Sequence, residues 1–261
     1  LKNIMWRREQ FRMADRPTFC LNLARQLVVG KIRNQRTLLM RNHVEPPQAA
    51  LRFLRALVGE ADRAKSLAEL LGLEGLAART YFENFAGMIK VDRPYHSELD
   101  AAQKLSFDFL RRNRRPPRDP INALLSLGYS LLAKDLTITA ASVGLDPYLG
   151  FYHQPRFGRA SLALDLMEPF RPLIVDSAIL TAVNQRMVTP QHFIAAGDSV
   201  ALTPEGRKGF FGAYEQRMDQ LVTHPLFGYR VSYRRILEIQ TRLLARVLMG
   251  EILEYPVFVT R

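Results

Sequence analysis

Hydrophobic residues recur at intervals of three and four along most of the chain, which is the period of an amphipathic helix. The first clear run follows Asp15 and Pro17, and these two residues are typical of a helix start. Its apolar positions are Phe19, Cys20, Leu23, Ala24, Leu27 and Val28. The pair Pro46–Pro47 ends or interrupts this helix, because proline lacks the amide hydrogen that an inner helical turn needs.

The same period continues beyond this point. A second helix is expected around residues 50–57 and a third over 66–85. A long helix is expected over 122–140, and since it is apolar nearly all round it should be central. Residues 203–205 start another helix, and the last one runs over about 232–249.

Strand signals are few. Residues 193–202 indicate one short hairpin that turns at Gly197–Asp198, and residues 91–104 indicate an exposed connection. No apolar run approaches the ~18–20 residues of a membrane span. The pattern therefore predicts an all-α fold, a multi-helix domain with one short β-hairpin.

One carboxylate interrupts the apolar stripe of the third helix. Glu74 falls among Leu67, Leu70, Leu71, Ala77 and Tyr81 at helical spacing. A buried carboxylate is costly unless it is paired or bound to a metal. The flanking Gly72 and Gly75 would let a backbone or ligand approach closely. A salt bridge to an arginine of another helix explains Glu74 equally well.

A second cluster of polar residues lies between 150 and 168. Asp165 and Glu168 are three residues apart, and therefore share one face of a helix that begins near Ser161. His153 lies on the preceding glycine-containing loop. A lone histidine is more often structural, but one imidazole with carboxylate oxygens suits Mg²⁺ or Mn²⁺. Spacing alone does not rank Glu168 above Asp165 as a ligand.

Net charge narrows the class of partner. The chain has 37 Lys and Arg against 25 Asp and Glu, a net charge of +12, and 30 of the 37 are arginine. Arginine suits bidentate phosphate contacts, so a polyanion such as nucleic acid is favoured over a membrane surface. Codon usage is the alternative source of this arginine excess.

Two arginine-rich segments stand out. Residues 111–118 hold five arginines and two prolines, which predicts a semi-rigid basic patch for phosphates. Arg235, Arg242 and Arg246 form a stripe with Glu238 on the last helix, and an intrahelical ion-pair face is the favoured explanation there.

Several catalytic classes find no support. Cys20 is the single cysteine and falls on an apolar stripe, which excludes a disulfide framework or a cysteine-based zinc site within the chain and indicates an inert core thiol. The sequence has no GxSxG, Walker, GxGxxG or HExxH motif.

Taken together, five segments resemble the Cas1 family, the CRISPR-associated integrases of spacer acquisition. They are WRREQFRMADRPTFCLNLARQLVVGKIRNQRTLLMRN (6–42), LLGLEGLAARTYFENF (70–85), RRNRRPPRDPINALLSLGYSLL (111–132), GLDPYLGFYHQPRFGRASLALDLMEPFRPLIVD (144–176) and TPEGRK (203–208). Their order and spacing make the resemblance specific.

The resemblance implies a metal site. It assigns Glu74, His153 and Glu168 as the catalytic ligands of one Mg²⁺ or Mn²⁺ ion, with Asp165 behind them to orient a ligand or a water. It also implies DNA as the substrate, with phosphates held by arginines of the basic segments. The candidates are Arg33, Arg36, Arg111, Arg112, Arg114, Arg115, Arg118, Arg156 and Arg159.

The resemblance further implies an activity and partners. The activity is insertion of captured protospacer DNA into CRISPR repeat DNA, by attack of a 3′-hydroxyl on a phosphodiester, and nuclease activity when water attacks instead. The partners are a second copy of the chain, as a homodimer, the small ferredoxin-like Cas2 subunit and, in some systems, a Cas4 exonuclease. A prokaryotic cytoplasmic location follows.

The resemblance also bears on domain organisation. Residues 1–261 are expected to form a single helical catalytic domain, with 1–10 as the end of an interdomain linker from the family's small N-terminal β domain. The rival interpretation is a non-catalytic helical scaffold that binds nucleic acid, in which arginines neutralise the acidic residues.

Overall fold

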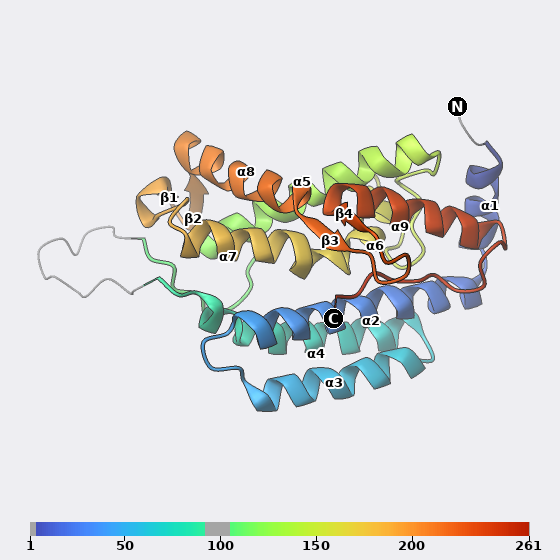
Figure 1. Cartoon of the computed structure of the whole chain (residues 1–261), viewed down its shortest axis with the longest axis horizontal. Helices are drawn as coiled ribbons and strands as arrows, with labels where there is room; N and C mark the ends of the chain where they lie inside the picture. The colour runs from blue at the N-terminus through green and yellow to red at the C-terminus, as the bar shows by residue number, and fades with distance from the viewer. Residues whose placement is uncertain (1–3, 92–104, 261) are drawn as a thin grey trace, which may run out of the picture.

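The computed structural model describes residues 4–91 and 105–260, and most of them are helical (Figure 1). The longer helices are α1 (Ile4–Ala14), α2 (Pro17–Asn42), α3 (Gln48–Arg63), α4 (Leu67–Glu83), α5 (Pro120–Val143), α8 (Pro204–Asp219) and α9 (Tyr233–Leu248). The shorter ones are η1 (Phe85–Met88), α6 (Ser161–Met167), η2 (Arg171–Asp176), α7 (Ser177–Asn184) and η3 (Pro190–His192). The all-α prediction is confirmed.

The helices lie in two layers (Figure 1). Helices α2, α3 and α4 pack against one another in the lower layer, while α5, α7, α8 and α9 form the upper one. Helix α2 also contacts α6 and η2. A cluster of side chains from α2, α4 and α6 therefore lies where the two layers meet.

Local signals start most of these helices where the sequence places them. The side chains of Ser66, Asp119, Thr203 and Ser232 each accept a hydrogen bond from a backbone N–H in the first turn of α4, α5, α8 and α9. Such caps satisfy amides that have no partner within the helix.

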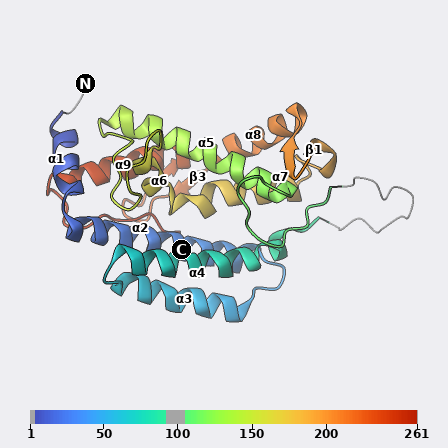
Figure 2. The ribbon, with the colours of Figure 1, turned by 180° about the vertical axis from the view of Figure 1, so that it is seen from behind.

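Helix α5 is central, as its apolar composition predicts. It contacts α6, α7, α9 and η2, and it crosses the upper layer in the view from behind (Figure 2). It ends at Gly144, whose φ of 111° is a left-handed conformation that favours glycine.

The helical path from α6 to α7 is irregular around Glu168. Glu168 and Pro169 form the turn after α6, and η2 is one stretch of π-helix that leads directly into α7. Pro169 and Pro172 lack the amide hydrogens that would continue a regular helix here. Wide helical turns of this type are frequent at functional sites.

The described residues form two short antiparallel hairpins rather than one. Strands β1 (Phe193–Ala196) and β2 (Ser199–Leu202) pair as predicted, with Phe193 opposite Leu202. Strands β3 (Leu221–Thr223) and β4 (Arg230–Ser232) form a second hairpin that the sequence pattern missed. Three residues per strand are too few to show an alternating pattern.

The N-terminal segment is helical. Ile4–Ala14 form helix α1, which packs against α2 and α9, and residues 1–10 as the end of an interdomain linker stay a prediction. Asp15 does not cap α2, because α1 reaches Ala14 and Arg16 is the residue that precedes Pro17. Of the predicted connection 91–104, only Val91 lies among the described residues.

The hydrophobic core runs between and within the layers, and its bulkiest fully buried side chains include Tyr81, Phe85, Phe170, Phe210 and Phe258. Within the described ranges, no helix combines the length and the apolar character that crossing a membrane would require.

Candidate functional site

The three predicted ligands converge where α4, α6 and the loop after α5 meet helix α2. Glu168 is buried at the end of α6, and His153 Nε2 lies 3.9 Å from its Oε1 atom. Glu74 reaches the same cluster from α4, with 15% of its side chain exposed. The structure thus brings together three residues that are distant in sequence: Glu74 and His153 are 79 positions apart, and His153 and Glu168 are 15 positions apart.

The environment of Glu74 differs in detail from the sequence-based picture. Leu70 and Tyr81 are buried, but Leu71 is 60% exposed, so the apolar stripe is narrower than predicted. Apart from neighbouring residues and the backbone of α4 itself, no described atom lies within 4 Å of where a Cβ would stand at Gly72 or Gly75, so no other described part of the chain approaches these glycines closely.

Lys31 lies between the two glutamates. Its Nζ donates a hydrogen bond to Glu74 Oε1 and lies 2.7 Å from Glu168 Oε2. Lys31 itself is buried, with 4% of its surface exposed. The ammonium therefore joins helix α2 to α4 and α6 through one charged contact at the centre of the cluster.

Asp165 holds the loop that carries His153. Its Oδ2 accepts hydrogen bonds from the backbone N–H groups of Phe151 and Tyr152 at 2.6 and 3.0 Å, and its Oδ1 accepts from His153 N at 2.8 Å. His153 Nδ1 also lies 2.8 Å from Asp165 Oδ1. A neutral imidazole that donates from Nδ1 keeps its Nε2 lone pair directed towards Glu168.

Tyr152 and Arg171 complete the cluster. The Tyr152 hydroxyl donates to Glu74 Oε2 at 2.6 Å, and Arg171 Nη2 lies 3.2 Å from Glu168 Oε1. Burial alone would raise the pKa of Glu74, but the Lys31 charge and the Lys31 and Tyr152 hydrogen bonds outweigh it and lower this pKa well below its usual range. Glu74 is therefore ionised at neutral pH.

Arg171 links this cluster to a second buried carboxylate. Its guanidinium lies 4.7 Å from the ring centroid of Tyr129, whose hydroxyl donates to Asp176 Oδ1 at 2.7 Å. The Tyr81 hydroxyl donates to Asp176 Oδ2 at 2.8 Å. The result is a continuous buried network from α4 through η2 to α5, which fixes the Arg171 side chain beside Glu168.

The donor set suits a hard divalent cation, because it combines two carboxylates with one imidazole nitrogen. Glu168 Oε2 is buried and accepts no hydrogen bond among the described residues, although Lys31 neutralises its charge. As they stand, however, no three His, Cys, Asp or Glu side chains of the described ranges surround one metal-sized position. The position between Glu74 and Glu168 is taken by the Lys31 ammonium.

The nine predicted phosphate-binding arginines separate into two groups. Arg36 donates from Nε to the backbone oxygen of Leu51 at 3.1 Å, and Arg159 donates to Gln154 O. Arg112 donates to Asn122 Oδ1 at 2.7 Å and lies over the Tyr129 ring. The other six are exposed at the surface, and they are Arg33, Arg111, Arg114, Arg115, Arg118 and Arg156.

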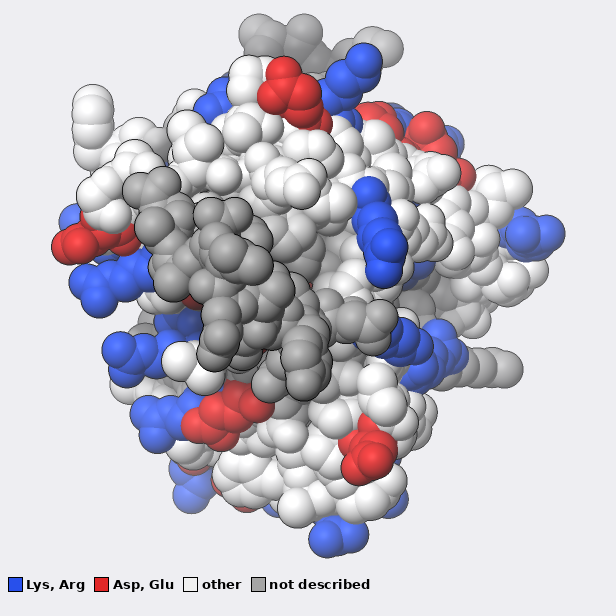
Figure 3. All heavy atoms as spheres, turned by 90° about the vertical axis from the view of Figure 1, so that its left-hand side faces the viewer, with Lys and Arg blue, Asp and Glu red and all other residues white. Residues whose placement is uncertain are grey.

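On the end of the molecule seen in Figure 3, Lys and Arg side chains lie on both sides of the picture, with Asp and Glu side chains among them. On α9, Arg235 and Arg242 both pair with Glu238, the latter at 2.9 Å, which confirms the predicted ion-pair face.

Cys20 is an inert thiol, as predicted. It is buried against α1, where its Sγ lies 3.4 Å from the Ala14 carbonyl oxygen, and burial raises its pKa.

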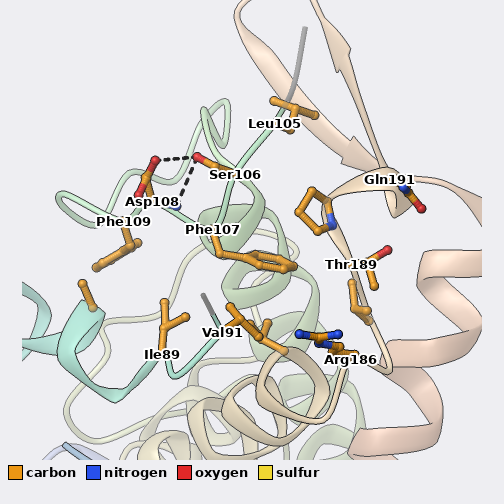
Figure 4. Close-up of a pocket in the computed structure, with 14 residues that line it drawn as sticks. Ile89, Val91, Leu105, Ser106, Phe107, Asp108, Phe109, Arg186, Thr189 and Gln191 are labelled. Carbon is orange, nitrogen blue, oxygen red and sulfur yellow. Dashed lines mark hydrogen bonds between the residues drawn. The ribbon is translucent and has the colours of Figure 1, made fainter. Parts of the chain in front are cut away.

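An apolar pocket of about 500 Å³ lies away from this cluster (Figure 4). Phe107, Val91 and Ile89 line it on one side and Arg186 and Thr189 on the other, and the Ser106–Asp108 hydrogen bond lies at its edge. None of the predicted site residues contributes to it.

Sequence reasoning missed Lys31, Tyr152 and Arg171. Lys31 left one signal, since it follows Leu27 and Val28 by helical spacing and so places a charge on the apolar face of α2. Tyr152 and Arg171 left none, because their partners come from distant parts of the chain.

Comparison with known proteins identifies a family. The profile of the family described as "CRISPR associated protein Cas1" matches residues 1–216. A "CRISPR-associated exonuclease Cas4/endonuclease Cas1 fusion" from Geobacter sulfurreducens is 48% identical over 266 residues, which cover 100% of this chain and 46% of that protein. The chain thus spans less than half of the fusion protein.

Two further matches agree. A "CRISPR-associated endonuclease Cas1 3" from Thermus thermophilus is 42% identical over 260 residues, which cover 100% of this chain and 73% of that protein. A chain of a solved "Cas6-RT-Cas1--Cas2 complex" superimposes with a TM-score of 0.80 at 28% identity, and covers 99% of this chain and 27% of its own length. The profile match and these identities show that the chain belongs to the Cas1 family.

Proposed function

We propose that this chain carries the catalytic site of a divalent-metal-dependent DNA integrase and endonuclease of CRISPR adaptation. Its substrates are double-stranded protospacer DNA with 3′ ends and CRISPR repeat DNA. The observation that carries the proposal is the convergence of Glu74, His153 and Glu168 from three separate segments onto one side of α2.

In this proposal Glu74, Glu168 and His153 Nε2 hold one Mg²⁺ or Mn²⁺ ion. When bound, such an ion lowers the pKa of a coordinated hydroxyl and offsets the charge that develops on a phosphodiester under attack. Asp165 fixes the orientation of the His153 ring through Nδ1 and leaves Nε2 on the side of Glu168. Tyr152 and Arg171 hold Glu74 and Glu168 in position.

The exposed arginines hold the DNA backbone. Arg156 lies on the same loop as His153, and Arg111, Arg114, Arg115 and Arg118 precede α5. Contacts of this kind position DNA without specifying its sequence. We assign Arg36, Arg112 and Arg159 to the fold instead, because their guanidinium groups bind the protein's own oxygen atoms.

The family also suggests partners. One relative is a fusion with a Cas4 exonuclease, and the superimposed structure is a complex that contains Cas2. We propose that this chain acts as a homodimer with a Cas2 subunit, and with a fused or separate Cas4 exonuclease.

The direct test is strand transfer of a short DNA duplex into repeat-containing DNA in Mn²⁺, with cleavage followed in parallel. Glu74→Gln and His153→Ala should each abolish both reactions, because each removes a donor atom from the proposed site. Glu83→Gln on the same helix is the control, since Glu83 is exposed and lies outside the cluster. Unchanged activity in both site variants would refute the proposal.

The non-catalytic scaffold stays as the second candidate because of one observation. Both glutamates form salt bridges, Glu74 with Lys31 and Glu168 with Lys31 and Arg171, although the partner of Glu74 is a lysine rather than the expected arginine. A scaffold would bind DNA in a salt-dependent manner and show no Mn²⁺-dependent reaction. The strand-transfer assay on the unmodified chain therefore separates the two candidates.

A further inference from the structure

Lys31 is in direct contact with both glutamates of the cluster. Its ammonium is hydrogen-bonded to Glu74 Oε1 and lies 2.7 Å from Glu168 Oε2. Arg171, by contrast, pairs with Glu168 through the other carboxylate oxygen, Oε1. Glu74 Oε1 and Glu168 Oε2 therefore both lie beside the same ammonium.

Two ionised carboxylates of this kind repel each other when they are removed from water, and leaving either unpaired is strongly destabilising. Glu168 is 1% exposed, and Lys31 is 4% exposed, so solvent does little to screen the charges. A cation between them is required, and in this structure Lys31 supplies it.

A divalent cation held by Glu74 and Glu168 would compete with the Lys31 ammonium for the negative charge of these two carboxylates. Both cannot occupy the position between them, because like charges a few ångströms apart repel strongly in a buried site. Tyr152 binds Glu74 Oε2 and Arg171 lies beside Glu168 Oε1, which are the carboxylate oxygens that Lys31 does not contact. Both side chains could therefore stay in place when a metal ion replaces the ammonium.

We propose that Lys31 is an internal counter-ion that occupies the metal position and yields it to the divalent cation. Lys31 holds Glu74 and Glu168 together before the metal arrives, and it weakens metal binding because the cation must displace it. It is a positioning residue that sets the concentration of divalent cation at which the site becomes occupied. The inference rests on the proposed function, since it takes Glu74 and Glu168 as metal ligands.

The test measures Mn²⁺ affinity by isothermal titration calorimetry on the purified chain. Lys31→Gln and Lys31→Met should each bind Mn²⁺ about tenfold or more tightly than the unmodified protein, because a competing positive charge is gone. Lys31→Arg keeps the charge and should not tighten binding. Lys65→Met, an exposed lysine just before α4, should leave the affinity unchanged.

Thermal unfolding provides the second measurement. Without metal, Lys31→Gln should unfold at a lower temperature than the unmodified chain, because two carboxylates lose their shared cation. Added Mn²⁺ should raise this temperature more in Lys31→Gln than in the unmodified chain, since ligand binding to the folded state stabilises it. A merely structural lysine would lower stability without tightening metal binding.

The outcomes separate this inference from the proposed function. If Glu74→Gln weakens Mn²⁺ binding but the Lys31 variants bind no more tightly than the unmodified chain, the metal site stands and the inference is wrong. If Mn²⁺ binds to neither the unmodified chain nor the Lys31 variants, both are wrong. Binding to the Lys31 variants that is tighter than to the unmodified chain and lost on adding Glu74→Gln supports the inference.

Discussion

At the scale of single residues, the structure around the site depends on buried carboxylates whose oxygen atoms all accept hydrogen bonds from the protein. Asp165 accepts three backbone N–H groups and contacts His153 Nδ1, while Asp176 accepts two tyrosine hydroxyls. Neither side chain touches water to any extent, since both are at most 1% exposed. The orientation of both carboxylates is therefore set by the fold.

Asp165→Asn should lower the free energy of unfolding by about 3 kcal/mol, because an amide cannot accept every hydrogen bond that the carboxylate accepts. It should also weaken Mn²⁺ binding, since it releases the loop that orients His153. Urea denaturation measures the first effect and calorimetric titration the second. Asp62→Asn, an exposed residue near the end of α3, is the control, and equal stabilities of the two variants would contradict the role given to Asp165.

Asp176 should make stability depend on pH. Burial raises its pKa to about 6, although the Tyr129 and Tyr81 hydroxyls oppose the shift; an exposed aspartate titrates near 3.9. The folded state thus holds the proton more tightly. Its contribution to stability is complete below about pH 4 and is lost as the pH rises through about 6.

Relative to Asp176→Asn, the unmodified chain should therefore lose about 2 kcal/mol of unfolding free energy between pH 4 and pH 7. Urea denaturation of both proteins at each pH measures this difference. A stability gap that is the same at both pH values would show that folding does not raise the pKa of Asp176.

At the scale of elements, the loop after α5 is shaped by how closely it approaches α6. A Cβ at Gly150 would lie 2.8 Å from His153 O and 2.9 Å from Asp165 Oδ2. These atoms are backbone and a fixed carboxylate, so they cannot move aside cheaply. The loop that carries Tyr152 and His153 therefore requires glycine at this position.

Gly150→Ala should lower the free energy of unfolding by about 1–3 kcal/mol, the usual cost of an added methyl group in a packed site. Gly212→Ala in α8 is the matched control, because its Cβ would meet only Met187 Cε at 3.7 Å and alanine favours helix. Thermal unfolding compares the two, and a loss of stability in Gly212→Ala but not in Gly150→Ala would contradict this account.

The elements that the sequence predicts are those with local signals. Ser66, Asp119, Thr203 and Ser232 mark helix starts because a cap acts within four residues. The hairpin β3–β4 was missed because its pairing depends on contacts made after folding. In the site, Glu74 was found because it broke a local period, whereas its partners Lys31 and Tyr152 are 43 and 78 positions away.

At the scale of the whole molecule, the net charge is +12, and some of the basic side chains bind other groups of the protein while others are exposed at its surface. Arg112 is bound within the protein, whereas Arg114 and Arg115, two and three positions further along, are exposed. The sequence could show that 111–118 is rich in arginine. Which of these side chains the fold uses depends on Asn122 and Tyr129 in α5, and only the structure shows this.

The double variant Arg114→Ala, Arg115→Ala should weaken duplex binding and lower the slope of log affinity against log salt by about two, since two phosphate contacts are lost. It should not change thermal stability. Arg112→Ala should instead lower the unfolding temperature, because it removes hydrogen bonds to Asn122 and Ser126. Fluorescence anisotropy at several salt concentrations measures binding, and an unchanged slope in the double variant would contradict the assignment.

The most direct test of the central claim is anomalous scattering at the manganese edge from crystals of this chain soaked in Mn²⁺. We expect one anomalous peak in contact with Glu74, Glu168 and His153 Nε2. We also expect Lys31 to have withdrawn from at least one of the two glutamates. The same soak of Glu74→Gln crystals should give a weaker peak or none. Lys31 still between both glutamates, with no peak beside them after soaking, would contradict the account.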